Sequence, residues 1–215
     1  MIFENNLKIL DAILDDDCGK FSETISQSIY DSDPNKEFDL INYKLPSILR
    51  NQPPYASLCC FFCAEKCFNA LSMFFPGGTN SEEMKKSDSF SRTPLHFACA
   101  GGNLEIIREL QQADSDINAK DFEGCTPSCY AAMAGNLDVL KFLWMKGAEI
   151  IPSKNFYARI NPLGAACLYG HLDIVKFIVE TIIPNLTVEE EKKSKRAKNS
   201  KQKQNPKQSL FSKQY

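Results

Sequence analysis

The chain has 215 residues, of which 43% are hydrophobic and 24% are charged, and this composition excludes a protein that is disordered or fibrous overall. Its longest apolar run, residues 58–64, is far shorter than the roughly 20 residues of a membrane helix, so we expect no transmembrane span. Glu4 and the lack of a basic start do not fit a secretory signal, so we expect the nine cysteines to be reduced thiols of a cytoplasmic protein.

The net charge of −2 conceals two parts of opposite sign. Residues 192–215 hold nine of the 25 basic residues and none of the 27 acidic ones, which leaves 16 basic against 27 acidic residues, a net charge of −11, in residues 1–191. We therefore expect an acidic folded body followed by a basic, disordered tail over residues 189–215.

Part of this tail fits the lysine-rich form of a nuclear localisation signal, which makes the nucleus an alternative location. A plain solvated tail explains the same composition, and contact with nucleic acid or anionic lipid is a third interpretation. The acidic body argues against nucleic-acid binding by the folded part itself. The residues of the candidate signal are Lys192, Lys193, Lys195 and Arg196.

The N-terminal half of the chain has apolar residues at helical spacing. Those at positions 7, 10 and 14 and at positions 21, 25 and 29 predict two helices with a break at residues 17–19. Residues 54–71 have the rhythm of a helix, a turn and a second helix, and a polar connection follows them up to residue 92.

A cluster of cysteines lies in this helical segment and consists of Cys59, Cys60, Cys63 and Cys67. Four thiolates can close a tetrahedral zinc site, so a zinc-binding protein is an alternative. Zinc sites built from cysteine usually take two close pairs from separate turns, and no second pair or histidine lies nearby in the sequence. We therefore interpret these residues as small side chains packed in a core, and we expect no metal or other cofactor.

Three later segments repeat one another, at residues 93–104, 126–137 and 161–172. Each has proline in its second position, glycine in its tenth and leucine in its twelfth. The spacing is 33 residues and then 35, which places two extra residues in the loop near residues 151–160. A recurring period of this length predicts an array of stacked units.

Each segment has the residues of a short helix, a turn and a second helix. Threonine or asparagine before proline suits a helix N-cap, and the glycine suits the left-handed conformation that ends a helix. Apolar residues of the second helix, at 104, 107 and 110 and at the corresponding positions, are expected to form the stacked core. The residues that define the motif are Thr93, Pro94, His96, Gly102, Thr126, Pro127, Gly135, Pro162, Gly170 and His171.

The Thr-Pro-Leu-His-x-Ala pattern of residues 93–98, recurring with a period of 33, resembles the signature of the ankyrin repeat. The helical N-terminal region makes the chain similar to a group of protist ankyrin proteins. The resemblance implies an all-α solenoid of helix-turn-helix units with short hairpin fingers. It implies a helical cap at 1–50, a divergent repeat and linker at 51–88, and repeats at 89–124, 125–158 and 159–188.

The same resemblance implies a non-catalytic scaffold or adaptor that binds a partner protein through its finger tips and inner-helix face. Several of the implied contacts are aromatic or apolar, which is typical of interface hot spots, although packing against neighbouring fingers is an alternative role for them. The implied contact residues are Phe90, Arg92, Phe122, Glu123, Cys125, Met133, Tyr157, Arg159, Leu168 and Tyr169.

The sequence offers no catalytic group of residues beside these repeats. A cysteine nucleophile needs a base, and both histidines, His96 and His171, lie at motif positions where the family's histidine resembles a structural group that bonds to neighbouring backbone. The glycine pairs at 77–78 and 101–102 lack the pattern of a phosphate loop. We therefore expect that the protein is not an enzyme.

The last predicted helix is unusually apolar for the end of an array. Positions 172, 175 and 178 are assigned to its inner row, and four large side chains then still need burial: Ile174, Phe177, Ile182 and Ile183. We therefore expect self-association through the C-terminal repeat, or contact with another partner, rather than cover from residues 184–188.

Overall fold

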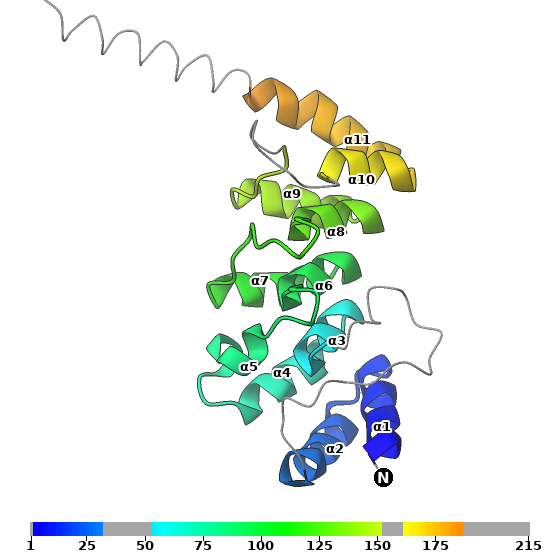
Figure 1. The fold of residues 1–215 in the computed structure, drawn as a ribbon, viewed down its shortest axis with the longest axis vertical. Helices are drawn as coiled ribbons and strands as arrows, with labels where there is room; N and C mark the ends of the chain where they lie inside the picture. Colours follow the sequence, from blue (N-terminus) through cyan, green and yellow to red (C-terminus); the bar gives the residue numbers. More distant parts are fainter. Residues whose placement is uncertain (1, 32–52, 152–160, 187–215) are drawn as a thin grey trace, which may run out of the picture. The chain divides into compact units, whose positions relative to one another are not determined.

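The computed structural model describes residues 2–31, 53–151 and 161–186 (Figure 1). Within these ranges every regular element is a helix, which confirms the expected all-α class. The chain divides into two compact units, residues 1–174 and 175–215.

The first two helices, α1 (Ile2–Leu14) and α2 (Cys18–Asp31), pack against each other, and α2 also packs against α4. Asp17 begins α2, because its Oδ1 accepts hydrogen bonds of 3.1 Å from the backbone N–H groups of Gly19 and Lys20. The break between the two helices therefore lies at residues 15–17 rather than at the predicted 17–19. The aspartate cap lets α2 begin at Cys18, before the glycine at position 19. The apolar residues buried in this pair include Ile9, Ile13, Phe21 and Ile25.

The next pair, α3 (Tyr55–Phe61) and α4 (Glu65–Phe74), has the plan of a repeat without its signature. Cys63 takes φ of +58° at the end of the first helix, where the later units have glycine. The short elements η2 (Gly78–Asn80) and α5 (Glu82–Lys85) follow and lead to the first regular repeat.

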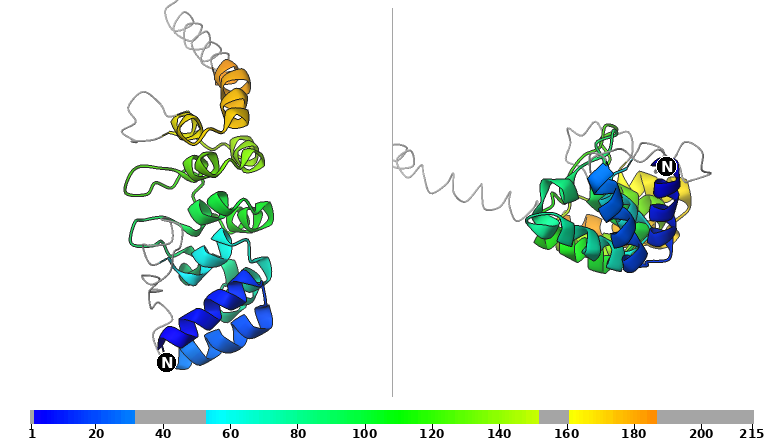
Figure 2. Two further views of the ribbon diagram at one scale, coloured as in Figure 1. Left: turned by 90° about the vertical axis from the view of Figure 1, so that its right-hand side faces the viewer. Right: turned by 90° about the horizontal axis from the view of Figure 1, so that it is seen from below.

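The three regular repeats begin in the same way, with proline as the first helical residue. Their helices are α6 (Pro94–Gly101) with α7 (Leu104–Gln112), α8 (Pro127–Ala134) with α9 (Leu137–Met145), and α10 (Pro162–Tyr169) with α11 (Leu172–Phe177). The inner helices end at Gly102, Gly135 and Gly170, whose φ angles of +94°, +79° and +79° are open to glycine at little cost. Figure 2 shows how successive inner helices of the first unit, α3, α6, α8 and α10, lie next to one another.

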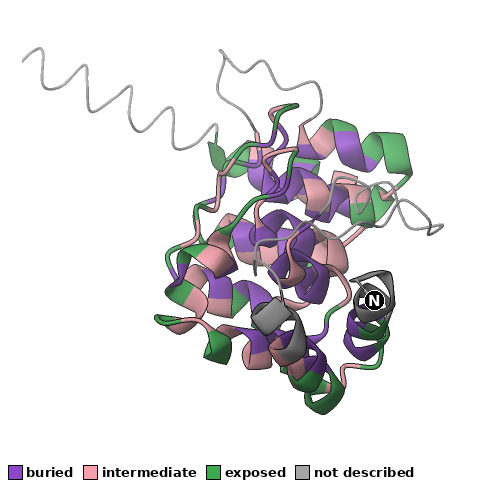
Figure 3. Ribbon diagram, turned by 60° about the horizontal axis from the view of Figure 1, so that its bottom comes forward, coloured by how far each residue is buried: buried purple, intermediate pink, exposed green. Residues whose placement is uncertain are grey.

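The outer helices bury two of the three positions that the sequence predicted for each of them, and the third position differs. In both α7 and α9 the three buried residues are the third, fourth and seventh of the helix, while the first leucine is only half-buried. Figure 3 colours the ribbon by burial. Packing against the inner helix buries Ile106 and Val139 in place of the leucines at positions 104 and 137. The buried residues are Ile106, Ile107 and Leu110, and Val139, Leu140 and Leu143.

The final helix corrects the expectation for the end of the chain. Ile174 is buried whereas Leu172 is 62% exposed, so position 172 does not belong to the inner row. In the second unit, the π-helical segment η3 (Ile178–Ile182) buries its first and last residues. Two of the four side chains that were expected to need cover, Ile174 and Ile182, are thus buried.

Side chains of one repeat clasp the backbone of the repeat before it. Asn136 Nδ2 donates to the carbonyl oxygens of Cys99 and Ala100, at 2.9 and 3.0 Å. His171, which follows Gly170 as Asn136 follows Gly135, donates from Nε2 to the carbonyl oxygen of Met133 at 2.9 Å. These bonds satisfy carbonyl groups at the ends of α6 and α8 that have no partner within their own helices.

Gly101 marks a very close approach between two repeats. A Cβ atom at this residue would lie 2.5 Å from the carbonyl oxygen of Phe61 and 2.7 Å from that of Cys60. Both oxygens belong to the backbone, so neither can swing aside. The last residue of α6 therefore has to be glycine if α3 and α6 are to pack at this distance.

We predict that Gly101→Ala destabilises the protein by about 1–3 kcal/mol, the cost of forcing atoms into a packed contact. At an exposed helical site the same change would stabilise by roughly 0.5–1 kcal/mol. Ala134 is the equivalent residue of the next repeat and is exposed, so Ala134→Gly is the matched control and should cost no more than about 1 kcal/mol. Urea unfolding measures both, and a Gly101→Ala variant at least as stable as the parent would contradict the close contact.

Gly135 and Gly170 provide a second matched pair. Both have φ of +79°, so alanine costs about 1–2 kcal/mol at either one. A Cβ atom at Gly135 would also lie 2.7 Å from the His171 ring, whereas nothing lies within 4 Å at Gly170. Gly135→Ala should therefore lower the free energy of unfolding by about 1 kcal/mol more than Gly170→Ala, because it also disturbs the His171 clasp. Equal losses in urea unfolding would show that the clasp contributes nothing.

Candidate functional site

The finger before each of the first two regular repeats is built around one aspartate. In the first finger (residues 86–92) Asp88 Oδ1 accepts from the backbone N–H groups of Phe90 and Arg92, at 3.0 and 2.8 Å. In the second finger (residues 119–125) Asp121 Oδ1 accepts from those of Glu123 and Cys125, at 2.9 and 2.8 Å. These local bonds hold each finger in a tight turn.

Each turn includes a residue with positive φ, three positions after its aspartate. Gly124 has φ of +79° and Ser91, in the equivalent position, has φ of +60°. Ser91 thus takes the conformation for which the second finger has glycine, and the bonds to Asp88 hold the backbone there despite the strain of a side chain in this region.

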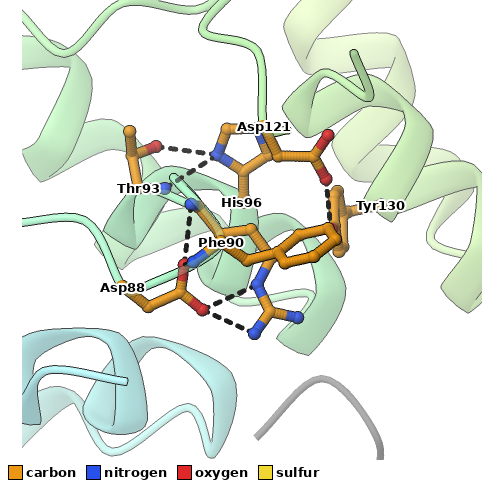
Figure 4. Close-up of polar contacts among 7 residues, drawn as sticks. Asp88, Phe90, Thr93, His96, Asp121 and Tyr130 are labelled. Carbon is orange, nitrogen blue, oxygen red and sulfur yellow. Dashed lines mark hydrogen bonds and ion pairs between the residues drawn. The ribbon is translucent and has the colours of Figure 1, made fainter. Parts of the chain in front are cut away.

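The second carboxylate oxygen of each aspartate faces a different partner (Figure 4). Asp88 Oδ2 accepts from Nε of Arg92 at 2.8 Å, and this ion pair is buried. Asp121 Oδ2 accepts from the Tyr130 hydroxyl at 2.7 Å. Burial and this bond to the carboxylate both raise the pKa of Tyr130 well above its ordinary value, so the tyrosine stays neutral.

His96 connects the first repeat to the next finger. Its Nδ1 accepts from the backbone N–H of Thr93 at 3.0 Å, which closes a capping box, and its Nε2 lies 3.2 Å from the carbonyl oxygen of Cys125 (Figure 4). The ring also meets Tyr130 edge to face, at 5.2 Å between ring centroids. Burial lowers the pKa of His96, so the neutral ring donates from Nε2.

The two fingers contact each other at their tips. The backbone N–H of Phe122 donates to the carbonyl oxygen of Phe90 at 3.1 Å. Their rings pack edge to face with centroids 5.7 Å apart, and the guanidinium of Arg92 lies 5.7 Å from the Phe90 ring. Phe122 remains 71% exposed, so its aromatic ring lies on the surface. Its backbone is held by the bond to Phe90 and by the turn around Asp121.

The structure separates the ten implied contact residues into four groups. Phe122, Glu123, Leu168 and Tyr169 are exposed, and Phe90 and Met133 are half-buried. Arg92 and Cys125 are buried, at 4% and 1% exposure. Tyr157 and Arg159 lie outside the described residues.

Burial removes Arg92 and Cys125 from the set of partner contacts. Arg92 neutralises the Asp88 carboxylate inside the finger, and Cys125 offers its backbone to Asp121 and His96. Both residues therefore stabilise the finger from inside and do not form part of its exposed surface.

The site residues predicted from the sequence do not include the aspartates that shape this surface. Asp88 and Asp121 lie 33 residues apart, each five positions before the threonine of its repeat. This recurrence in the sequence could have indicated that the two aspartates have the same role. Their role in the turn becomes visible only in the structure, where each carboxylate accepts hydrogen bonds from backbone N–H groups.

The cysteine cluster shows no metal-binding geometry in the part of the chain that the structure describes. Cys67 Sγ donates to the carbonyl oxygen of Ala12 at 3.5 Å, and Cys63 Sγ donates to that of Gly101 at 3.3 Å. Burial raises the pKa of Cys59 and Cys60 well above the ordinary value, and that of Cys67 to about 12. Such thiols are protonated and poor nucleophiles.

The C-terminal tail and the candidate nuclear signal, residues 192–196, lie outside the described residues. Over the ranges that are described, no helix is both long and apolar enough to cross a bilayer.

Comparison with known proteins gives a family match over the repeats. The family of ankyrin repeats, in a model of three copies, matches residues 58–154. This stretch begins within α3 and so includes the divergent unit of α3 and α4 as well as the next two repeats.

Three similar curated proteins illustrate the match. An ankyrin repeat and KH domain-containing protein of Caenorhabditis briggsae is 35% identical over 91 residues, 40% of this chain and 3% of that protein. The ankyrin repeat protein nuc-2 of Neurospora crassa is 28% identical over 105 residues, 48% of this chain and 10% of that protein. Transient receptor potential cation channel subfamily A member 1 of Drosophila melanogaster is 27% identical over 117 residues, which are 51% of this chain and 10% of that protein. The chain thus spans a tenth or less of each of these relatives.

We predict that His96 makes stability fall in mildly acidic solution. Its pKa is lower in the folded protein than the 6.5 of the free side chain, so the unfolded chain binds the proton more tightly. The stability that this neutral histidine provides is present above pH 6.5 and is lost as the pH falls toward the lowered pKa, by at most about 1.4 kcal/mol per pH unit. Urea unfolding of the parent and of His96→Gln between neutral and mildly acidic pH checks this, and equal slopes would contradict it.

Proposed function

Because the chain belongs to the ankyrin-repeat proteins, we propose that it acts as a non-catalytic scaffold or adaptor that binds a partner protein through the inner face of its repeats. This face comprises the finger tips and the exposed side of the inner helices. Stacked repeats offer such an extended surface without any change in the core behind it.

The exposed ring of Phe122 is the observation that carries this proposal. An aromatic side chain has few rotatable bonds, and here the bond to Phe90 fixes the backbone as well, so a partner would lose little entropy in ordering it. Met133, which is half-buried on the inner helix α8, and Tyr169, which is exposed on the inner helix α10, supply further apolar area. These residues favour a partner that presents apolar or aromatic side chains.

The absence of catalysis is part of the same proposal. Both ring nitrogens of His96 are engaged with backbone groups, and His171 bonds through Nε2 to Met133. His96 is therefore not available as a base beside a nucleophile.

We predict that Phe122→Ala weakens capture of the partner by about thirtyfold, because truncating a central aromatic contact typically costs about 2 kcal/mol. Met145→Ala is the matched control, since Met145 is also 71% exposed but lies on the outer helix α9. Both variants should keep the melting temperature of the parent, because neither side chain is buried. Affinity capture followed by titration with the captured protein measures the difference.

The Met145→Ala control distinguishes binding at a specific face from non-specific binding to any exposed apolar side chain. If Met145→Ala weakens capture as much as Phe122→Ala, or if Phe122→Ala has no effect, the inner face at the fingers is not the binding surface.

A further inference from the structure

The second regular repeat has a cysteine where the first has its capping histidine. In α6 the third helical residue, His96, accepts from the backbone N–H of Thr93 through Nδ1. In α8 the third helical residue is Cys129, whose sulfur accepts from the backbone N–H of Thr126 and lies 3.6 Å from the Thr126 hydroxyl oxygen. A protonated sulfur is a weak acceptor, and a thiolate makes stronger, charge-assisted bonds. The capping position therefore favours the ionised form of Cys129.

A second cysteine donates to this sulfur. Cys125 comes directly before the N-cap residue Thr126, and its thiol is hydrogen-bonded to the thiol of Cys129. This bond lowers the pKa of Cys129, the acceptor, and raises the pKa of Cys125, the donor. We call these two residues the thiol pair. It combines a sulfur that ionises readily with a second sulfur in contact with it.

Other buried cysteines of the repeats differ from the thiol pair. Burial raises the pKa of Cys59, Cys60 and Cys99, so these thiols stay protonated at neutral pH. Since the thiolate is the form that reacts with oxidants, they are expected to react more slowly than Cys129. They serve below as internal references.

The position of the thiol pair restricts which oxidants can reach it. Both side chains are buried, each at 1% exposure, but the neighbouring finger residues Phe122 and Glu123 are exposed. A local opening of the finger is enough to admit a molecule as small as hydrogen peroxide, whereas a peptide thiol such as glutathione needs a larger one. After oxidation of Cys129, the thiol at hand is therefore Cys125 rather than one from solution.

We propose that Cys125 and Cys129 form an oxidation site at which hydrogen peroxide closes a disulfide beneath the second finger. The Cys129 thiolate attacks one peroxide oxygen, so an S–O bond forms and the O–O bond breaks; the leaving hydroxide takes up the proton that the thiol released and becomes water. The Cys125 sulfur then attacks the Cys129 sulfur, so the S–S bond forms and the S–O bond breaks. The second hydroxide takes the proton of Cys125, and two electrons have passed from the thiols to the peroxide.

Closure of the disulfide acts on the finger through Cys125. Its N–H donates to Asp121 at 2.8 Å, and its carbonyl oxygen lies 3.2 Å from Nε2 of His96. A covalent bond holds two sulfur atoms closer together than a hydrogen bond does, so Cys125 has to move toward α8. These two bonds and the finger tip at Phe122 are disturbed as a result. Regulation of partner binding in this way rests on the proposed function, whereas the oxidation itself does not.

Peptide mass spectrometry of the full chain after brief treatment with hydrogen peroxide tests the site. Trypsin cleaves after Lys120 and Lys141, and the peptide of residues 121–141 contains both cysteines of the thiol pair and no other cysteine. Remaining thiols are blocked with N-ethylmaleimide in denaturant before cleavage. We expect peptide 121–141 to lose its maleimide adducts and two hydrogen atoms, and to regain both adducts after reduction with dithiothreitol. The peptide that contains Cys99 should carry its adduct throughout.

Two single variants test the separate roles of the two sulfurs. In Cys125→Ser the sulfenic acid has no second thiol, so it should persist on Cys129 and be trapped by dimedone. In Cys129→Ser the nucleophile is absent, so Cys125 should form no dimedone adduct and should remain open to maleimide. Hydrogen exchange of finger residues 119–125 should be faster in the oxidised parent than in the reduced parent, and peroxide should not change it in Cys129→Ser.

Three results would overturn the proposal at different steps. A parent whose peptide 121–141 still takes up two maleimides, or whose Cys59, Cys60 and Cys99 are oxidised equally fast, has no selective oxidation site. A dimedone adduct on Cys125 in place of Cys129 contradicts the order of the reaction. Unchanged hydrogen exchange in the oxidised parent contradicts the effect on the finger. None of these measurements involves a partner protein, so their failure is distinguishable from a failure of capture through Phe122.

Discussion

The close approach of successive inner helices is the constraint from which the rest of the first unit follows. Ala98, Ala131 and Ala166 are buried on these helices, and Gly101 has no room for a Cβ atom. Where backbones pack this closely, large side chains have to go elsewhere, and they fill the space between inner and outer helices instead. The same constraint leaves the fingers outside the core, where aromatic residues such as Phe122 can stand in solvent without disturbing the packing.

The fingers are held by bonds that do not depend on this core. Asp88 and Asp121 each organise a turn through their own neighbouring backbone N–H groups, while the second oxygen accepts from Arg92 in one finger and from Tyr130 in the other. A finger can therefore change its tip residues while the aspartate keeps its shape. This division between a fixed scaffold and a variable tip is what a binding surface needs.

The sequence predicted the all-α class and the stacked repeats, because proline at a helix start and glycine at a helix end act through the local backbone alone. It predicted two of the three buried positions of α7 and of α9 but not Ile106 and Val139, because both they and the first leucines are apolar, and only packing against the neighbouring helix decides which of them is buried. The burial of Arg92 could not be predicted from the sequence for a similar reason. Its partner Asp88 is close in sequence, but nothing in that stretch reveals that the pair turns inward.

The clasps between repeats give the array a direction. In both clasps the donor comes from the later repeat and the acceptor from the earlier one, as with His171 and the carbonyl of Met133. Loss of the third repeat would remove the donor that binds the second repeat. The second repeat would still donate from Asn136 to the first repeat. Unravelling from the C-terminal side thus exposes one bare helix end at a time, and assembly in the order of synthesis adds each donor to an acceptor that is already in place.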